Sequence, residues 1–266
     1  MLSLSLAVSA FLVAQTGPLE VTNVRPTVGP LGPTVSKADR EQGRLPGDQA
    51  WFAFEVKNAK TDAQGKAKIG LSYEVTASDG TPIFKEGPSV GELFDFLGSG
   101  SFPGMMHLDV PMDAKPGIYD VKLTITDMAT KKDAVYQAKG KVREPEFGIV
   151  RTAVFADPLG RVPSPSVGVL GQNLFIRFAA IHFGKKEKES NIEATLKVLD
   201  SDGKNILVHG QTKKLGGGLV PDSPWAPGDF GLTLNRVGEF TVEIHAEDKI
   251  ANKSAKMSFP LRVVTP

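Results

Sequence analysis

Hydrophobic and polar residues alternate along most of this 266-residue chain. A period of two is typical of β-strands that bury one face. No segment has a convincing helical period, so the sequence predicts an all-β protein. The clearest alternating runs lie at residues 52–56, 69–75, 119–125, 176–180, 192–198, 240–246 and 257–263.

Glycine and proline residues separate the alternating runs in combinations that are typical of tight turns. Ser78-Asp79-Gly80 and Ser201-Asp202-Gly203 are two examples, in which glycine supplies the positive φ that such turns require. Short strands with a turn about every dozen residues indicate antiparallel β-sandwiches.

The pattern of strands and turns occurs twice, about 120 residues apart. A repeat of that length suits a domain with its own hydrophobic core. We therefore expect two tandem sandwich domains at residues 17–143 and 147–266, joined by a short linker around Pro145. The matching segments are residues 47–54 with 171–178, 75–83 with 198–206, and 117–127 with 238–248.

The first residues have the pattern of an export signal. Residues 2–13 are apolar and uncharged, and small and polar residues follow at 14–18. We interpret residues 1–16 as a signal peptide, because the apolar run is too short to span a bilayer. The mature chain is then exported, with no membrane span, and is periplasmic, cell-surface or secreted. No Lys or Arg precedes the run, which leaves an apolar first strand or a misplaced start as alternatives.

Charge and composition exclude several function classes. The chain has 31 Lys and Arg residues and 30 Asp and Glu residues, and the two signs alternate, as in residues 185–189. This distribution argues against a nucleic-acid partner or an anionic membrane surface. Cysteine is absent, which excludes disulfides, thiol nucleophiles and cysteine-ligated zinc.

Candidates for catalysis or metal binding all have simpler interpretations. Residues 200–205 resemble a calcium loop, but the twelfth position holds Gln211 in place of the required Glu, so a hairpin turn is the better interpretation. Asp127 and Asp248 stand at equivalent strand ends, where each would cap a hairpin or ligate an ion. The four histidines lack metal-ligand spacing, and residues 98–104 match no nucleophile or phosphate motif. We predict no catalytic residues, no metal and no cofactor.

Residues 116–121 resemble the corner before strand F of immunoglobulin-like domains. Tyr119 matches the corner tyrosine, Val121 stands where the inter-sheet cysteine would be, and Phe240 replaces the tyrosine in the second unit. The chain thus resembles cysteine-free Ig-like or fibronectin-III-like modules of exported bacterial proteins, especially secreted proteins built from two such modules. The resemblance implies a Tyr119 hydroxyl bonded to the backbone, and it implies no active site.

Aromatic residues outside the expected core are the candidate binding residues. If Phe52 and Phe54 point inward, Trp51 points outward. The segments 88–104 and 213–228 differ between the two units while the flanking strands keep their phase, as binding loops on a rigid scaffold do. The alternatives are that Phe94, Phe96 and Trp225 close the open edge or end of each sandwich, and that the proline-rich segments 26–46 and 157–170 fold over Trp51. The predicted binding residues are Phe94, Phe96, Phe102, Trp225 and Trp51.

Three functions fit the sequence. The first is a non-enzymatic exported two-domain Ig-like protein that acts as a binding or spacer module at the bacterial cell envelope, with a protein or glycan as its partner. The second is a carbohydrate-binding protein that uses Trp51 or Trp225. The third is a hydrolase whose site has no recognisable motif. The fold cannot distinguish them, since sandwiches host many unrelated functions.

Overall fold

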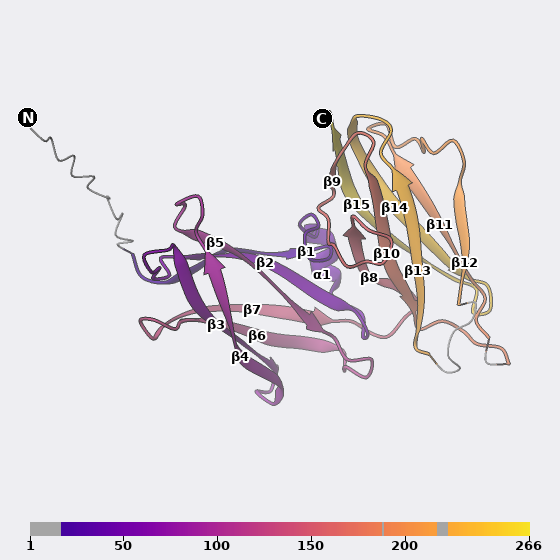
Figure 1. Ribbon diagram of the computed structural model, residues 1–266. Helices are drawn as coiled ribbons and strands as arrows, with labels where there is room; N and C mark the ends of the chain where they lie inside the picture. The colour runs from indigo at the N-terminus through magenta and orange to yellow at the C-terminus, as the bar shows by residue number, and fades with distance from the viewer. Residues whose placement is uncertain (1–16, 188, 217–222) are drawn as a thin grey trace, which may run out of the picture.

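The computed structural model describes residues 17–266 apart from residue 188 and residues 217–222. Over these residues the chain forms two β-sandwiches, one after the other in sequence (Figure 1). No sheet in the described residues combines strands from both halves of the chain. The predicted fold class is confirmed, whereas the predicted signal peptide at residues 1–16 lies outside the described residues.

The first sandwich packs a three-stranded sheet against a four-stranded sheet. The smaller sheet has the order β1-β2-β5, and the larger sheet has the order β4-β3-β6-β7. The strands are β1 (Glu20–Thr27), β2 (Gln49–Lys57), β3 (Lys66–Ala77), β4 (Pro82–Phe94), β5 (Ser101–Asp109), β6 (Gly117–Asp127) and β7 (Lys132–Val142), with a short helix α1 (Lys37–Gln42) between β1 and β2.

The second sandwich packs a three-stranded sheet against a five-stranded sheet. The orders are β13-β10-β8 and β12-β11-β14-β15-β9, and only β9 pairs in parallel, with β15. The strands are β8 (Gly148–Phe155), β9 (Val167–Val169), β10 (Asn173–Ile181), β11 (Ile192–Leu199), β12 (Gln211–Leu215), β13 (Trp225–Thr233), β14 (Gly238–Asp248) and β15 (Lys253–Val264).

The two sandwiches have the same strand order. In the smaller sheets, β8, β10 and β13 correspond to β1, β2 and β5. In the larger sheets, β12, β11, β14 and β15 correspond to β4, β3, β6 and β7, and β9 is an addition in the second sandwich. The sequence segments that match each other lie in these equivalent strands. The duplication itself, and the limits of the two domains, stay predictions from the sequence.

Each sandwich has its own core, and the first is the more open. In the second sandwich the inward residues of β11 and β14 are almost completely buried, as the alternating pattern predicts. In the first sandwich the second half of β3 is only half-buried, and β4 is exposed along nearly its whole length. Strand β4 lies at the edge of its sheet, so one of its sides has no neighbouring strand.

Asp127 and Asp248 have the same structural role in the two sandwiches. The Asp127 carboxylate accepts hydrogen bonds from the NH groups of Ala129 and Thr130 in the next turn and from that of Lys60 in a distant loop. Asp248 accepts from Ile250 and Ala251 in the same way, and from Gly184. Of the two alternatives left open by the sequence, capping of the hairpin is therefore the one observed, and each carboxylate also holds a second loop.

The hydrogen bonds to Asp127 favour its charged form. Burial by itself raises the pKa of this carboxyl, but the NH groups of Lys60, Ala129 and Thr130 outweigh it and lower the pKa below its ordinary value. The residue is buried, with 2% of its surface exposed, so its carboxylate is satisfied by these NH groups in place of water.

The corner expected at Tyr119 is present. Its hydroxyl donates to the carbonyl oxygen of Lys115, four residues upstream, at 2.7 Å. In the second sandwich Phe240 is buried in the core and holds the same position by packing. The turn at Gly203 also forms as expected, because the Asp200 carboxylate accepts from the NH groups of Asp202 and Lys204.

Two sequence interpretations are wrong. Helix α1 was not expected, since it depends on a cap and has no hydrophobic period: the Ser36 hydroxyl oxygen accepts from the NH of Asp39. The segment 88–97 was expected to be a loop, but most of it continues β4 as far as Phe94. Its residues do not alternate in polarity because both faces of this edge strand meet solvent.

We expect Asp127→Ala to lower the free energy of unfolding by about 1–3 kcal/mol, since it leaves three NH groups without an acceptor. Asp248→Ala should have an effect of the same size. Asp202→Ala, at an exposed turn position, is the control and should stay within about 0.5 kcal/mol of wild type. Urea-induced unfolding at neutral pH measures all three, and an Asp127 variant as stable as the control would contradict the assigned role.

The contribution of Asp127 should also depend on pH. Its folded-state pKa lies below the unfolded value of about 3.9, so its stabilisation is complete above about pH 5 and is lost as the pH falls through the folded-state pKa. The stability difference between wild type and Asp127→Ala should therefore shrink as the pH falls below about 5. Denaturation curves over that range test the sign.

Candidate binding surface between the two sandwiches

The segment between α1 and β2 packs against the second sandwich. Leu45 is 2% exposed and lies in a small apolar cluster with Val150, Ala179 and Ile181 of β8 and β10. The carbonyl oxygen of the next residue, Pro46, lies 3.1 Å from Nε2 of His182. The second sandwich therefore holds the chain in place immediately before β2 begins.

Asp48 is the polar centre of this contact. It is buried, and its Oδ1 accepts from the NH of Gln49 at 2.7 Å and from the NH of Arg151 at 3.0 Å. Its Oδ2 accepts from Nη1 of Arg44 at 3.2 Å. Because Arg151 belongs to β8, this one carboxylate joins the backbones of the two sandwiches.

A β-bulge aims Arg151 at the first sandwich. The register of β8 against β10 shifts between Val150 and Ala153, and Arg151 has a φ of 54°, which is uncommon for a residue other than glycine. Its Nε donates to the carbonyl of Gly47 at 2.9 Å, and its Nη2 donates to Oδ1 of Asp109 at 3.1 Å. The guanidinium carbon lies 5.0 Å from the ring centroid of Trp225.

The polar contacts continue along the outer face of β2 and β5. The Asp109 Oδ1 also accepts from Nε2 of Gln49 at 3.1 Å, and the Gln49 Oε1 accepts from the indole Nε1 of Trp51 at 2.8 Å. The Trp51 ring lies 4.6 Å from that of His107, at an angle of 37°. We call this set the junction surface: Trp51, His107, Gln49, Asp109, Arg151 and Trp225.

The junction surface is open to solvent and already ordered. The side chains of Asp109, His107 and Arg151 are 57%, 43% and 35% exposed. Hydrogen bonds fix the Trp51 indole and the Arg151 guanidinium in place before any ligand arrives. Aromatic faces flanked by amide, carboxylate and guanidinium groups can stack on a ligand and hydrogen-bond its polar groups.

The described residues contain no arrangement typical of nucleophilic or metal-assisted catalysis. No three His, Asp or Glu side chains among them lie close enough together to hold a metal ion. His107 and His245 lie beside Asp109 and Glu247, at 3.8 and 3.2 Å, but no Ser or Thr hydroxyl in this part of the chain hydrogen-bonds to a histidine. A hydrogen-bonded Ser–His or Thr–His pair is thus absent from the described residues.

The structure separates the five predicted binding residues into three groups. Trp51 and Trp225 both belong to the junction surface, at the end of the first sandwich where β2 begins. Phe94 and Phe96 lie at the other end, with rings stacked at 5.3 Å, and Phe96 is 82% exposed. Sequence reasoning missed the polar residues that connect the two tryptophans.

Phe102 has to be removed from the predicted binding residues. It is 2% exposed and lies in the core of the first sandwich, where it pairs with Val56 across β2 and β5. A ring in this position contacts the core and cannot reach a partner. Phe102 therefore stabilises the fold and is not a contact residue.

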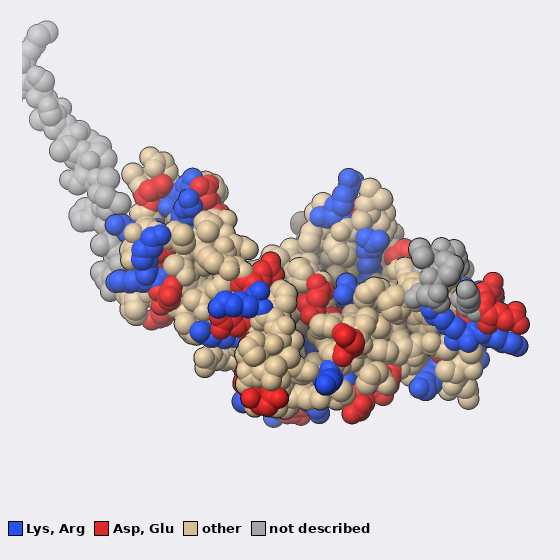
Figure 2. Space-filling model, turned by 90° about the horizontal axis from the view of Figure 1, so that it is seen from below, with Lys and Arg blue, Asp and Glu red and all other residues tan. Residues whose placement is uncertain are grey.

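Charged residues form no one-signed stripe on the face shown in Figure 2, where Lys and Arg alternate with Asp and Glu. Charged residues also pair with each other elsewhere in the described residues, as Lys213 does with Asp229 at 3.1 Å. Within the part of the chain that the structure describes, no helix is long and apolar enough to cross a membrane.

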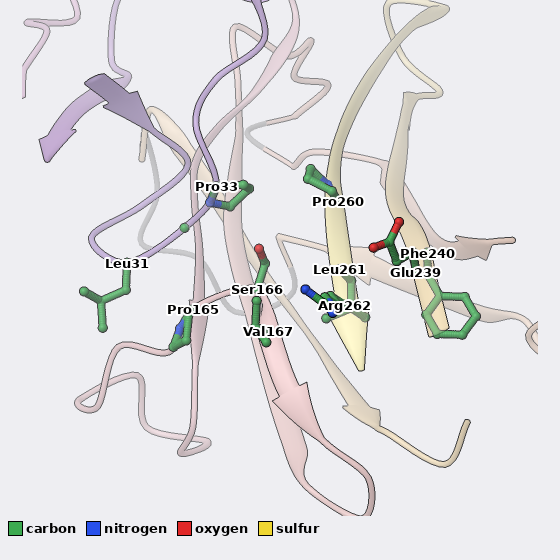
Figure 3. A pocket seen from close by; sticks show the side chains of 11 residues that line it. Leu31, Pro33, Pro165, Ser166, Val167, Glu239, Phe240, Pro260, Leu261 and Arg262 are labelled. Atoms are coloured by element: carbon green, nitrogen blue, oxygen red, sulfur yellow. The ribbon is translucent and has the colours of Figure 1, made fainter. Parts of the chain in front are cut away.

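A hollow of about 410 Å³ lies where the loop before α1 meets the second sandwich (Figure 3). Leu31 and Pro33 come from the first sandwich, and Val167 and Leu261 from the second. The lining is mostly proline and aliphatic, and the charged pair Glu239 and Arg262 stands across neighbouring strands. Because this hollow has few polar groups, it offers fewer hydrogen bonds that could orient a specific ligand than the junction surface does.

No protein family model matches this chain, and a search of curated proteins found no match. Among solved structures, it is similar to the C-terminal domain of the Streptococcus agalactiae AgI/II polypeptide BspA, with 10% identity, a TM-score of 0.30 and coverage of 91% of this chain and 99% of that one. It is also similar to the C-terminal domain of the Streptococcus pyogenes antigen I/II-family protein AspA, with 9% identity, a TM-score of 0.30 and coverage of 92% of this chain and 100% of that one.

A red sea bream transglutaminase is also similar, at 12% identity and a TM-score of 0.28, over 93% of this chain. The chain spans about a third of the length of that enzyme, since 31% of the enzyme is covered. At these TM-scores the similarities support no conclusion about the function of this chain.

Removing the Phe102 ring should lower the stability strongly, whereas removing the Phe96 ring should change it little. Phe102→Ala should cost about 3–5 kcal/mol, because it leaves a cavity in the core. Phe96→Ala should stay within about 0.5 kcal/mol of wild type, because its ring contacts mainly solvent. Urea-induced unfolding of both variants measures this, and a large loss for Phe96→Ala would show that its ring stabilises the fold.

Asp48→Ala should lower the free energy of unfolding by about 1–3 kcal/mol, since it removes the acceptor of the partly buried NH groups of Gln49 and Arg151. Lys213→Ala, which breaks an exposed ion pair, is the control and should cost less than about 1 kcal/mol. Chemical denaturation compares the two. Equal stabilities would mean that Asp48 does not hold the sandwiches together.

Proposed function

We propose that this chain is a non-enzymatic exported binding module of the bacterial cell envelope, and that the junction surface holds its ligand. One observation carries the proposal: Trp51 and Trp225, from different sandwiches, are connected through Gln49, Asp109 and Arg151 by contacts of 2.8 to 5.0 Å. Partly exposed aromatic rings with convergent polar groups are what a ligand site requires.

The order of the surface supports binding. The Trp51 indole is tied to Gln49, and Arg151 is tied to Gly47 and Asp109, so few side-chain rotations remain to be lost when a ligand arrives. Association then costs less conformational entropy than at a surface of free side chains. The strands β2, β5, β8 and β13 that carry these groups are hydrogen-bonded within their sheets.

The chemistry of the surface favours a glycan over a peptide. An indole face stacks on the apolar face of a sugar ring, and amide, carboxylate and guanidinium groups match sugar hydroxyls, which both donate and accept. Asp109 and Arg151 compensate each other's charge, which suits a neutral ligand. A cell envelope presents such glycans to an exported protein.

Trp51→Ala and Gln49→Ala should each weaken binding to a wall glycan about tenfold or more, the effect expected of central contact residues. Phe175→Ala is the matched control, since Phe175 is a half-buried aromatic at the equivalent position of β10. Co-sedimentation with purified peptidoglycan sacculi and calorimetric titration with soluble wall polysaccharide measure the affinity.

Binding that survives Trp51→Ala, with Phe175→Ala unchanged, would remove the junction surface as the site. If wild-type protein binds no wall glycan but captures an envelope protein through Trp51, the ligand of the junction surface is a protein and not a glycan. Release of new reducing ends from the polysaccharide would favour the hydrolase alternative. If the wild-type protein binds no glycan, captures no envelope protein and releases no reducing ends, the spacer role remains, and the fixed contact between the sandwiches is sufficient for it.

A further inference from the structure

The loop between β1 and α1 forms one wall of the hollow in Figure 3. The NH of Val28 donates to the carbonyl of Pro33 at 3.0 Å, which closes the loop, and Val28 packs against the core of the second sandwich. The loop is therefore held in place where it lines the hollow. We call this space the loop hollow, and the residues that concern us in its lining are Leu31, Pro33, Pro165, Ser166, Glu239 and Arg262.

Ser166 brings a buried hydroxyl to the loop hollow. The residue is 7% exposed, and its carbonyl accepts from the NH of Arg262 at 2.9 Å. Its hydroxyl makes no hydrogen bond to any residue that the structure describes, whereas that of the nearby Ser164 bonds to the carbonyl of Pro165. Buried polar groups are nearly always hydrogen-bonded. In Figure 3 the Ser166 oxygen faces the hollow, where a bound molecule can become its partner.

Two opposite charges line the loop hollow without pairing. Glu239 and Arg262 are direct partners across β14 and β15, with Cα atoms about 5 Å apart. Within the described part of the chain, neither side chain forms an ion pair with the other or with a third residue. By contrast, Glu243 on the same face of β14 pairs with Lys197 and Lys256, at 3.8 and 3.2 Å. The charges of Glu239 and Arg262 are thus available to a ligand.

We propose that the loop hollow binds a free apolar α-amino acid such as leucine. The Arg262 guanidinium is the group that binds a carboxylate through two parallel hydrogen bonds, and the Ser166 hydroxyl donates a further one. The Glu239 carboxylate accepts from the ammonium group. The side chain of the amino acid is buried against the aliphatic and proline wall formed by Leu31, Pro33 and Pro165.

The balance of charges selects this class of ligand. A fatty acid would satisfy Arg262 but would bring a second carboxylate close to Glu239, and a simple amine would leave Arg262 without a partner. A residue inside a peptide chain lacks both terminal charges. A volume of about 410 Å³ lies in the range of small-molecule sites, which begins at about 300 Å³.

This site is independent of the proposed glycan site. The loop hollow shares no residue with the junction surface, so either can fail without the other. Both sandwiches contribute to the loop hollow, because Leu31 and Pro33 come from the first and Ser166 and Arg262 from the second.

A series of truncated ligands tests each part of the proposal. Heteronuclear NMR titration of the full chain with leucine should shift the resonances of Ser166 and Arg262. Isocaproate lacks the ammonium group of leucine, isoamylamine lacks its carboxylate, and glycine lacks its side chain. Each should bind about tenfold or more weakly than leucine, because it leaves one charge or the apolar wall without its counterpart.

Variants of the lining residues give the second test. Arg262→Gln should weaken leucine binding about tenfold or more, since it removes the charge-assisted hydrogen bonds. Ser166→Ala should weaken it about two- to tenfold and leave the thermal stability unchanged, because its hydroxyl has no partner to lose in the described residues. Lys253→Gln, an exposed basic residue of the same strand β15 outside the hollow, is the control and should bind as wild type does.

Three results would overturn the proposal. The first is the absence of resonance shifts at millimolar leucine. The second is isocaproate that binds as tightly as leucine, which would mean that Glu239 does not contact the ligand. The third is an Arg262→Gln variant that binds leucine as tightly as the Lys253→Gln control does.

Discussion

The buried carboxylate of Asp48 is the interaction on which the arrangement of this protein depends. It accepts hydrogen bonds from the NH of its own strand β2 and from the NH of Arg151 in the second sandwich. Leu45 supplies the apolar part of the same contact. Separating Asp48 from Arg151 would break this hydrogen bond and expose the apolar cluster around Leu45, so such arrangements are disfavoured. Together with the bonds from Arg151 to Gly47 and Asp109, this contact sets the relative position of Trp51 and Trp225.

The bulge in β8 converts a structural contact into a candidate site. A regular strand would direct Arg151 along the alternating pattern of its sheet, whereas the bulge turns its side chain toward Gly47 and Asp109. The same guanidinium then covers the Trp225 ring. Arg151 therefore acts both as part of the bond between the sandwiches and as part of the surface presented to a ligand.

The two sandwiches share a strand order but differ in how far their edge strands and cores are exposed. The second has short edge strand β12 and a closed core, whereas the first has the long exposed strand β4 and a core that opens toward β3. The long exposed strand lies on the first sandwich, and the junction surface lies where β2 begins and also includes Arg151 and Trp225 of the second sandwich. Asp127 and Asp248 each hold a distant loop in the same way, so the two scaffolds share this feature although their exposed strands differ.

The sequence by itself determined the features that depend on neighbours along the chain: the strands, from alternation; the Gly203 turn; and the Tyr119 corner, whose bond spans four residues. It left Asp127 and Asp248 open, because their distant partners Lys60 and Gly184 carry no sequence signal. It misplaced Phe102 because Pro103 and Gly104 interrupt the alternation of β5. Only the tertiary structure decided the junction surface, since Asp48 and Arg151 are 103 residues apart and such contacts depend on how two complete sandwiches pack.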